Sequence, residues 1–168
     1  MISIIIIVTS LLLDGLLTNY LSYLPNNLTL FTPLLTLTSI FLIYPFYRKN
    51  NKKYYYTIFI LGFIYDLFYT NLLFYHAFLF LLLGFFIRFL YKNLEISWIR
   101  NIIYLFLLIT IYELINGGII YIFNLVPVTI EKIFYKIEHS LLLNIIYGEI
   151  IYFIIKIIPN KYKKNNIN

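Results

Sequence analysis

Five ionisable side chains lie inside long apolar segments of this sequence: Asp14, Asp66, His76, Glu113 and Glu149. An ionised carboxylate at the centre of a bilayer costs at least ~2.5–3.5 kcal/mol, so such residues face a bundle interior, pair with one another or become protonated. Three kinds of chemistry use groups of this type: a proton relay, a polar ligand pocket, and a pair of aspartates that shares one proton.

Asp66 and His76 are the two groups whose spacing predicts a direct contact. Asp66 precedes the outer end of the expected third span by four residues, which places it about 6 Å deep at 1.5 Å per residue. His76 lies at a similar depth in the antiparallel fourth span, so a contact across this hairpin is expected. It would serve a proton relay or, as we favour, a structural hydrogen bond, because intramembrane polar pairs commonly hold helices together. The Asp66 carboxylate is also placed to cap a neighbouring stretch of backbone.

Small and amide residues accompany the other three carboxylates. They are Gly15 beside Asp14, Asn116 and Gly117 beside Glu113, and Asn144 and Gly148 beside Glu149. Small residues let a neighbouring helix approach closely, and amides form hydrogen bonds between helices. Two interpretations stay open: a polar lumen or ligand pocket, and interhelical hydrogen bonds between protonated carboxylic acids and amides.

Other catalytic and metal chemistry has little support in the sequence. Cysteine is absent, which excludes disulfides, thiolate metal sites and cysteine catalysis. No serine lies in a G-x-S-x-G setting, there is no phosphate-binding glycine loop, and neither His76 nor His139 is part of an H-E-x-x-H motif. An intramembrane aspartyl enzyme would need Asp14 and Asp66 to meet, which we do not favour. We therefore expect no catalytic residue, no metal and no cofactor.

The composition predicts an all-α integral membrane protein with a single domain, residues 1–168. The chain is 62% hydrophobic and 12% charged, whereas a typical soluble domain is about 45–50% apolar and about 25% charged. A span needs about 20 apolar residues. The six expected transmembrane helices are residues 2–23, 28–47, 54–70, 72–91, 101–124 and 140–158. The first lacks the basic start and small-residue cleavage site of a signal peptide, so it is expected to be retained.

The basic residues predict how the chain is oriented. Eleven of the 13 Lys and Arg residues fall on one side of the expected spans: Arg48, Lys49, Lys52, Lys53, Arg88, Lys92, Arg100, Lys156, Lys161, Lys163 and Lys164. Only Lys132 and Lys136 fall on the other. By the positive-inside rule both termini and the basic loops are cytoplasmic. This pattern identifies the charge as an orientation signal, and we expect no nucleic-acid partner.

The connector before the sixth span has its own periodicity. Ile130, Ile133, Phe134 and Ile137 recur at i, i+3, i+4 and i+7 within residues 129–138, with charged residues on the other face. This spacing predicts a short amphipathic helix on the outer membrane interface. The alternative is a helical lead-in to the sixth span.

The third and fourth expected spans resemble the rod shape-determining MreD family. That family has a Gly-x-x-x-Asp step at the end of one span, a short turn, and a following span that runs through a glycine. Gly62 and Asp66 match the step within the segment ILGFIYDLFY, and Gly84 matches the glycine of the following span, which begins NLLFYHA. Asp14-Gly15 also resembles the divergent forms of the family. The turn here is rich in Tyr and Phe, where a smaller turn with Gly is commoner.

The resemblance implies a non-enzymatic function in bacterial cell-wall elongation, at the inner (plasma) membrane of a bacterium. Its partners would be a bitopic MreC-like protein, the peptidoglycan synthases of the elongation complex and, indirectly, the actin-like MreB. The family's six-helix bundle resembles the substrate-binding S-components of energy-coupling-factor transporters. The structural or partner-binding candidates are Asp14, Gly15, Gly62, Asp66, His76, Gly84, Glu113 and Glu149.

Two functions are compatible with these features of the sequence. The favoured one is a membrane scaffold that binds MreC and links the cytoskeleton to peptidoglycan synthases. The alternative is the substrate-capture subunit of an energy-coupling-factor vitamin or metal transporter, in which Asp66, His76 and Glu113 would contact the ligand. Against it, the first span lacks the ladder of small residues that such subunits offer to their coupling partner. The basic clusters 48–53 and 161–164 are expected to contact anionic lipid headgroups or, less favoured, a cytoskeletal partner.

Overall fold

The computed structural model describes residues 2–22, 32–70, 72–93, 97–123 and 129–157. Throughout this part of the chain the only regular secondary structure is helical, as the sequence predicts. The helices are α1 (Ile2–Ser22), α2 (Leu35–Tyr47), α3 (Asn51–Tyr69), α4 (Tyr75–Asn93), α5 (Trp98–Ile122) and α6 (Ile130–Ile157).

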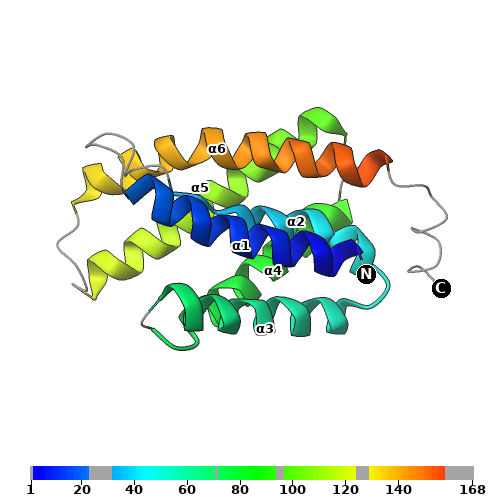
Figure 1. Ribbon diagram of the computed structural model, residues 1–168, viewed down its shortest axis with the longest axis horizontal. Coiled ribbons are helices and arrows are strands. Elements are labelled where there is room, and N and C mark those ends of the chain that lie inside the picture. Colours follow the sequence, from blue (N-terminus) through cyan, green and yellow to red (C-terminus); the bar gives the residue numbers. More distant parts are fainter. Residues whose placement is uncertain (1, 23–31, 71, 94–96, 124–128, 158–168) are drawn as a thin grey trace.

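The six helices form one bundle with α2 at its centre (Figure 1). Helices that follow one another along the chain pack in pairs, α1 with α2, α3 with α4, and α5 with α6. Helix α2 also contacts each of the other four, and eleven of its thirteen residues are buried. A helix that is apolar on all sides belongs in the core.

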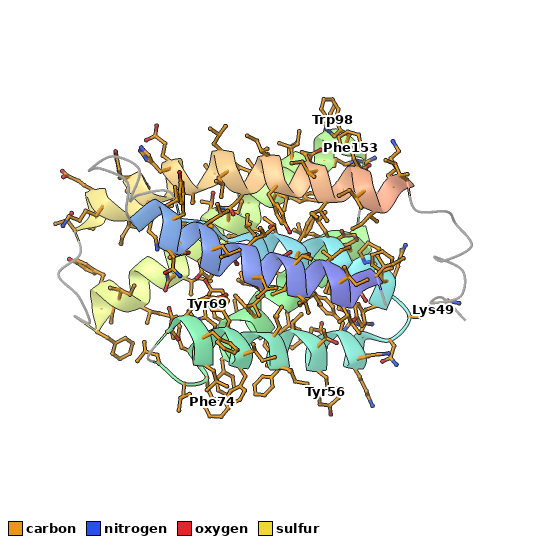
Figure 2. All side chains as sticks on the ribbon, in the orientation of Figure 1. Lys49, Tyr56, Tyr69, Phe74, Trp98 and Phe153 are labelled. Carbon is orange, nitrogen blue, oxygen red and sulfur yellow. The ribbon has the colours of Figure 1, made fainter. Side chains whose placement is uncertain are left out.

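Positive charge collects at one end of the bundle, which we call the basic end. It lies to the right in Figure 1, where α1 begins, α6 ends, and α2 connects to α3. Figure 2 labels Lys49 there. The described bases at this end are Arg48, Lys49, Lys52, Lys53, Arg88, Lys92, Arg100 and Lys156. Lys132 and Lys136, on the first turns of α6, lie at the opposite end.

The outside of the bundle is apolar. Leu16 of α1, Phe89 of α4 and Ile157 of α6 expose 65%, 61% and 80% of their surface. Among the described residues, four helices are long and apolar enough to cross a membrane: α1, α4, α5 and α6. Helix α2 is apolar but shorter.

The second span, expected over residues 28–47, was predicted to begin too early, as the described residues 32–34 show. Residues 32–34 are not helical and α2 begins at Leu35; residues 28–31 lie outside the described part of the chain. At 1.5 Å per residue, the thirteen residues of α2 extend about 20 Å, less than the ~30 Å thickness of the hydrocarbon core. The helix begins late because side chains of α1 and α6 cap its first turn, as described below.

The other helix ends differ from expectation by a few residues. Helix α3 begins at Asn51, three residues early, because the Asn50 side chain accepts a hydrogen bond from the Lys53 N–H (3.0 Å) as an N-cap. Helix α4 begins at Tyr75, three residues late, after Phe74, whose φ of 65° is a left-handed conformation that favours glycine. A glycine at this position would avoid this cost.

The separate amphipathic helix before the last span is a wrong prediction, and the alternative of a helical lead-in is confirmed. Helix α6 runs without a break from Ile130 to Ile157, about 42 Å. The lead-in packs on α5 rather than lying free: Ile137 is buried, and Ile133 fills the space over Gly117. No proline or glycine interrupts residues 130–147, so nothing ends the helix there.

Candidate functional site

Asp66, near the end of α3, is fully buried and caps the start of α4. Its carboxylate accepts hydrogen bonds from the backbone N–H of His76 (2.9 and 3.1 Å) and of Ala77 (3.3 Å). The Thr70 hydroxyl also donates to it (2.9 Å). The first N–H groups of a helix have no partner within that helix. In this protein a side chain of the preceding helix supplies the acceptor.

His76 extends the contacts of Asp66 to a third helix. Its Nδ1 lies 2.7 Å from an Asp66 oxygen, so the contact expected from the sequence is present. Its Nε2 lies 3.1 Å from the hydroxyl of Tyr112 on α5. A neutral imidazole that donates from Nδ1 accepts at Nε2, so each group has a suitable partner. The chain Asp66–His76–Tyr112 ties α3, α4 and α5 together.

Gly62 explains how Asp66 reaches α4. It lies one turn before Asp66 on the same face of α3, which is the spacing of the Gly-x-x-x-Asp step. A Cβ atom on Gly62 would lie 2.6 Å from the Ala77 Cα and the His76 carbonyl oxygen. The absence of a side chain therefore lets the two backbones approach closely enough for the carboxylate to contact the first N–H groups of α4.

Asp14 of α1 caps α2 in the same way. It is 2% exposed, and its two oxygens accept from the N–H groups of Leu35 and Thr36, each at 2.7 Å. The preceding N–H, of Leu34, donates to the side-chain oxygen of Asn144 on α6 (2.6 Å). Side chains from two helices thus fix the start of the central helix inside the bundle.

Gly15 receives an aromatic ring from α3. The Tyr69 hydroxyl donates to the Leu11 carbonyl (2.7 Å), and a Cβ on Gly15 would lie 2.5 Å from that hydroxyl oxygen. Figure 2 labels Tyr69 at the end opposite Lys49. The Asp14-Gly15 step therefore does two things: the carboxylate caps α2 and the glycine accommodates Tyr69.

Glu113 of α5 forms an ion pair with the lead-in of α6. Its carboxylate lies 3.2 Å from the Lys136 ammonium and accepts from the Thr32 hydroxyl (3.2 Å). Glu113 is buried, whereas the Lys136 side chain is 35% exposed. Asn116, one turn on, accepts from the Tyr75 hydroxyl (2.7 Å).

The remaining candidates lie apart from this cluster. Glu149 faces the start of α5, where Asn101 donates to it (2.6 Å). The other oxygens of both side chains, Glu149 Oε2 and Asn101 Oδ1, are buried without a hydrogen-bond partner in the described structure. Gly84 of α4 packs against the Ile58 side chain of α3. We call the polar residues around Asp14, Asp66, His76 and Glu113 the polar cluster.

Sequence reasoning missed two members of the polar cluster, Lys136 and Tyr69. The amphipathic spacing of residues 129–138 predicts a separate surface helix that contains Lys136. The continuous α6 instead places Lys136 two turns before Asn144, on the face that meets α5. Nothing in the spacing of Tyr69 distinguishes it from the other aromatic residues of the turn.

The polar cluster is arranged to join helices. Asp14 and Asp66 each accept backbone N–H groups of different helices, and no hydrogen bond between the two is found among the described residues. The same residues contain no group of three or more His, Cys, Asp or Glu side chains that is able to hold a metal ion.

Asp14→Asn is expected to lower the free energy of unfolding by about 1–2 kcal/mol, because one of two buried N–H groups loses its acceptor to an amide NH₂. Unfolding in detergent, followed by circular dichroism, measures this. Glu149→Gln is the control: its new amide is able to donate to the orphaned Asn101 oxygen, so it should be neutral or stabilising. Equal losses in both variants would contradict the cap.

Comparison with known proteins identifies a family for this chain. A family model described as rod shape-determining protein MreD matches residues 1–162, nearly the whole chain. No protein of curated function and no solved structure matches this chain significantly.

Proposed function

This chain belongs to the family of the rod shape-determining protein MreD, which gives it a role in rod shape determination, and we propose that it is a membrane scaffold of the bacterial cell-wall elongation machinery. In this proposal it has no enzymatic activity. It binds a bitopic MreC-like protein and, with it, links the actin-like MreB to the peptidoglycan synthases of the elongation complex.

The polar cluster is the observation that carries the proposal. A substrate-capture subunit needs convergent polar groups that are available to a ligand. Here Asp66, His76 and Glu113 are engaged by backbone N–H groups, a tyrosine and a lysine of the chain itself. The N-terminus of an inner helix is also a ready anion site, and Asp14 and Asp66 fill two of these. Because these polar groups are already bound by other groups of the same chain, the cluster favours a rigid scaffold over a ligand-capture site.

The surface supports a location in the bacterial inner membrane. Exposed apolar side chains cover the outside, and four helices are long and apolar enough to cross a bilayer. We propose that residues 1–168 are one membrane domain, with an arrangement like that of energy-coupling-factor S-components. The basic end then faces the cytoplasm with both termini, by the positive-inside rule.

A pull-down tests the proposal. The tagged full-length protein is extracted from its native membrane in mild detergent, and the proteins recovered with it are identified by mass spectrometry. Recovery of an MreC-like bitopic protein with peptidoglycan synthases is expected. Recovery of paired ATPases with a helical coupling subunit would overturn the scaffold and support the capture subunit instead. Glu138→Ala, an exposed substitution, is the control for non-specific loss of partners.

A further inference from the structure

Three helix ends meet around Tyr44 at the basic end. The Tyr44 ring on α2 lies 5.0 Å from that of Tyr54 on α3 and 4.9 Å from that of Tyr91 on α4. Its hydroxyl donates to Asn51 at the start of α3 (3.1 Å). The end of α2, the start of α3 and the end of α4 are therefore held together by packed aromatic rings.

Two arginines from different helices lie close to this cluster of rings. Arg48 follows the last residue of α2, four residues after Tyr44, and Arg88 lies on α4, three residues before Tyr91. Each arginine is therefore about one helical turn from a ring of this cluster, and both are exposed. Arg88 also lies beside Tyr55, whose buried hydroxyl has no hydrogen-bond partner of good geometry within the described residues. Two guanidinium groups thus border the same cluster of rings, and the Tyr55 hydroxyl lies beside one of them.

No carboxylate on these helices neutralises the two arginines. Asp66 is the only acidic residue of α2, α3 and α4, and it caps α4 at the opposite end of the bundle. The ion pairs of the described residues involve His76 and Lys136 and leave both arginines unpaired. Positive charge that the described residues leave uncompensated is available to an anion from outside.

We infer that Arg48 and Arg88, the latter beside the Tyr55 hydroxyl, bind the phosphate of an anionic phospholipid. The guanidinium group offers a planar fork of donors that matches phosphate oxygens. Beside Arg88, Phe85 and Phe89 are 60% and 61% exposed, and the Phe85 ring lies 4.7 Å from that of Tyr55. These rings give the acyl chains an apolar surface next to the headgroup site, which favours a lipid over a soluble acidic protein. The inference rests on the proposed membrane location and not on the scaffold function.

Lipid titration of the full-length protein tests this site. Phosphatidylglycerol is added to the detergent-purified protein, and bound lipid is counted by native mass spectrometry, with phosphatidylcholine as the uncharged reference. The wild type should prefer phosphatidylglycerol. Arg48→Gln with Arg88→Gln should lower its affinity about tenfold, because both phosphate-binding forks are lost.

A second pair of substitutions tests whether lipid binding depends on these two arginines or only on the total positive charge of the basic end. Arg100→Gln with Lys156→Gln removes the same charge from the basic end, but on α5 and α6, and should lower the affinity less than threefold. If the first pair fails to fold, Tyr55→Phe removes the hydroxyl alone and should cost about threefold. Equal losses in the two pairs, no effect of Tyr55→Phe, or equal binding of the two lipids would overturn the inference. Recovery of MreC-like partners is a separate readout, so failure here leaves the scaffold proposal standing.

Discussion

Replacement of Asp66 by alanine is expected to lower the free energy of unfolding by about 4 kcal/mol. The substitution leaves the N–H groups of His76 and Ala77, and the His76 ring, without their acceptor in a fully buried place. Each buried donor that loses its partner costs about 1–3 kcal/mol. The loss is measured by unfolding the purified protein with increasing SDS in mixed micelles, and by the protein level in the native membrane.

Partner recovery gives Asp66→Ala a second readout. We propose that Asp66 stabilises the helix bundle and takes part in no reaction. The variant should therefore reduce both the protein level and the assembly with partners. Glu138→Ala, which removes an exposed carboxylate from α6, should change stability by less than about 0.5 kcal/mol. An Asp66→Ala protein with normal level and normal partner recovery would show that the cap is dispensable.

Gly62→Ala is expected to cost about 3 kcal/mol, an unusually large effect for one added methyl group. The new Cβ would lie 2.6 Å from both the Ala77 Cα and the His76 carbonyl oxygen. Backbone atoms cannot rotate away as a side chain does, so α3 and α4 must separate. Overpacking of this kind typically costs 1–3 kcal/mol. Separation would also weaken the hydrogen bonds from α4 to Asp66, which adds to the loss.

Gly118→Ala is the matched control for Gly62→Ala. Gly118 is also a helical glycine, but a Cβ there would meet no atom within 4 Å. Alanine is favoured over glycine in a helix by about 0.8–1.0 kcal/mol, so this variant should be neutral or more stable. The same unfolding titration measures both. If the two substitutions have the same effect, close packing at Gly62 is not what the Gly-x-x-x-Asp step provides.

Features that depend on local spacing were predictable from the sequence. Asp66 and His76 flank one tight turn, so their contact follows from depth alone. The concentration of bases at one end follows from the order of spans and loops. The first prediction uses residues close in the chain, and the second uses only the alternation of spans and loops, so few arrangements compete with either.

Features that depend on contacts between distant segments were not predictable. Asp14 and Asn144 set the start of α2. Asp14 accepts a hydrogen bond from an N–H group 21 residues away in the chain, and Asn144 accepts one from an N–H group 110 residues away. Apolar residues before Leu35 give no sign of this, because a lipid-facing helix and a buried loop share the same composition. Lys136 is similar: its amphipathic surroundings suggest an interface, and only the packing of α6 on α5 brings it to Glu113.

The position of the two capping aspartates in the chain bears on the order of assembly. Asp14 precedes the helix it caps by 21 residues, and Asp66 precedes its first backbone donor by ten. A nascent chain that ends before Leu35 or before His76 therefore holds a carboxylate for which no backbone donor has yet been synthesised. The smallest segments that satisfy these groups are the hairpins α1–α2 and α3–α4. A pair of helices, and not a single helix, is therefore the natural unit of membrane insertion for α1–α4.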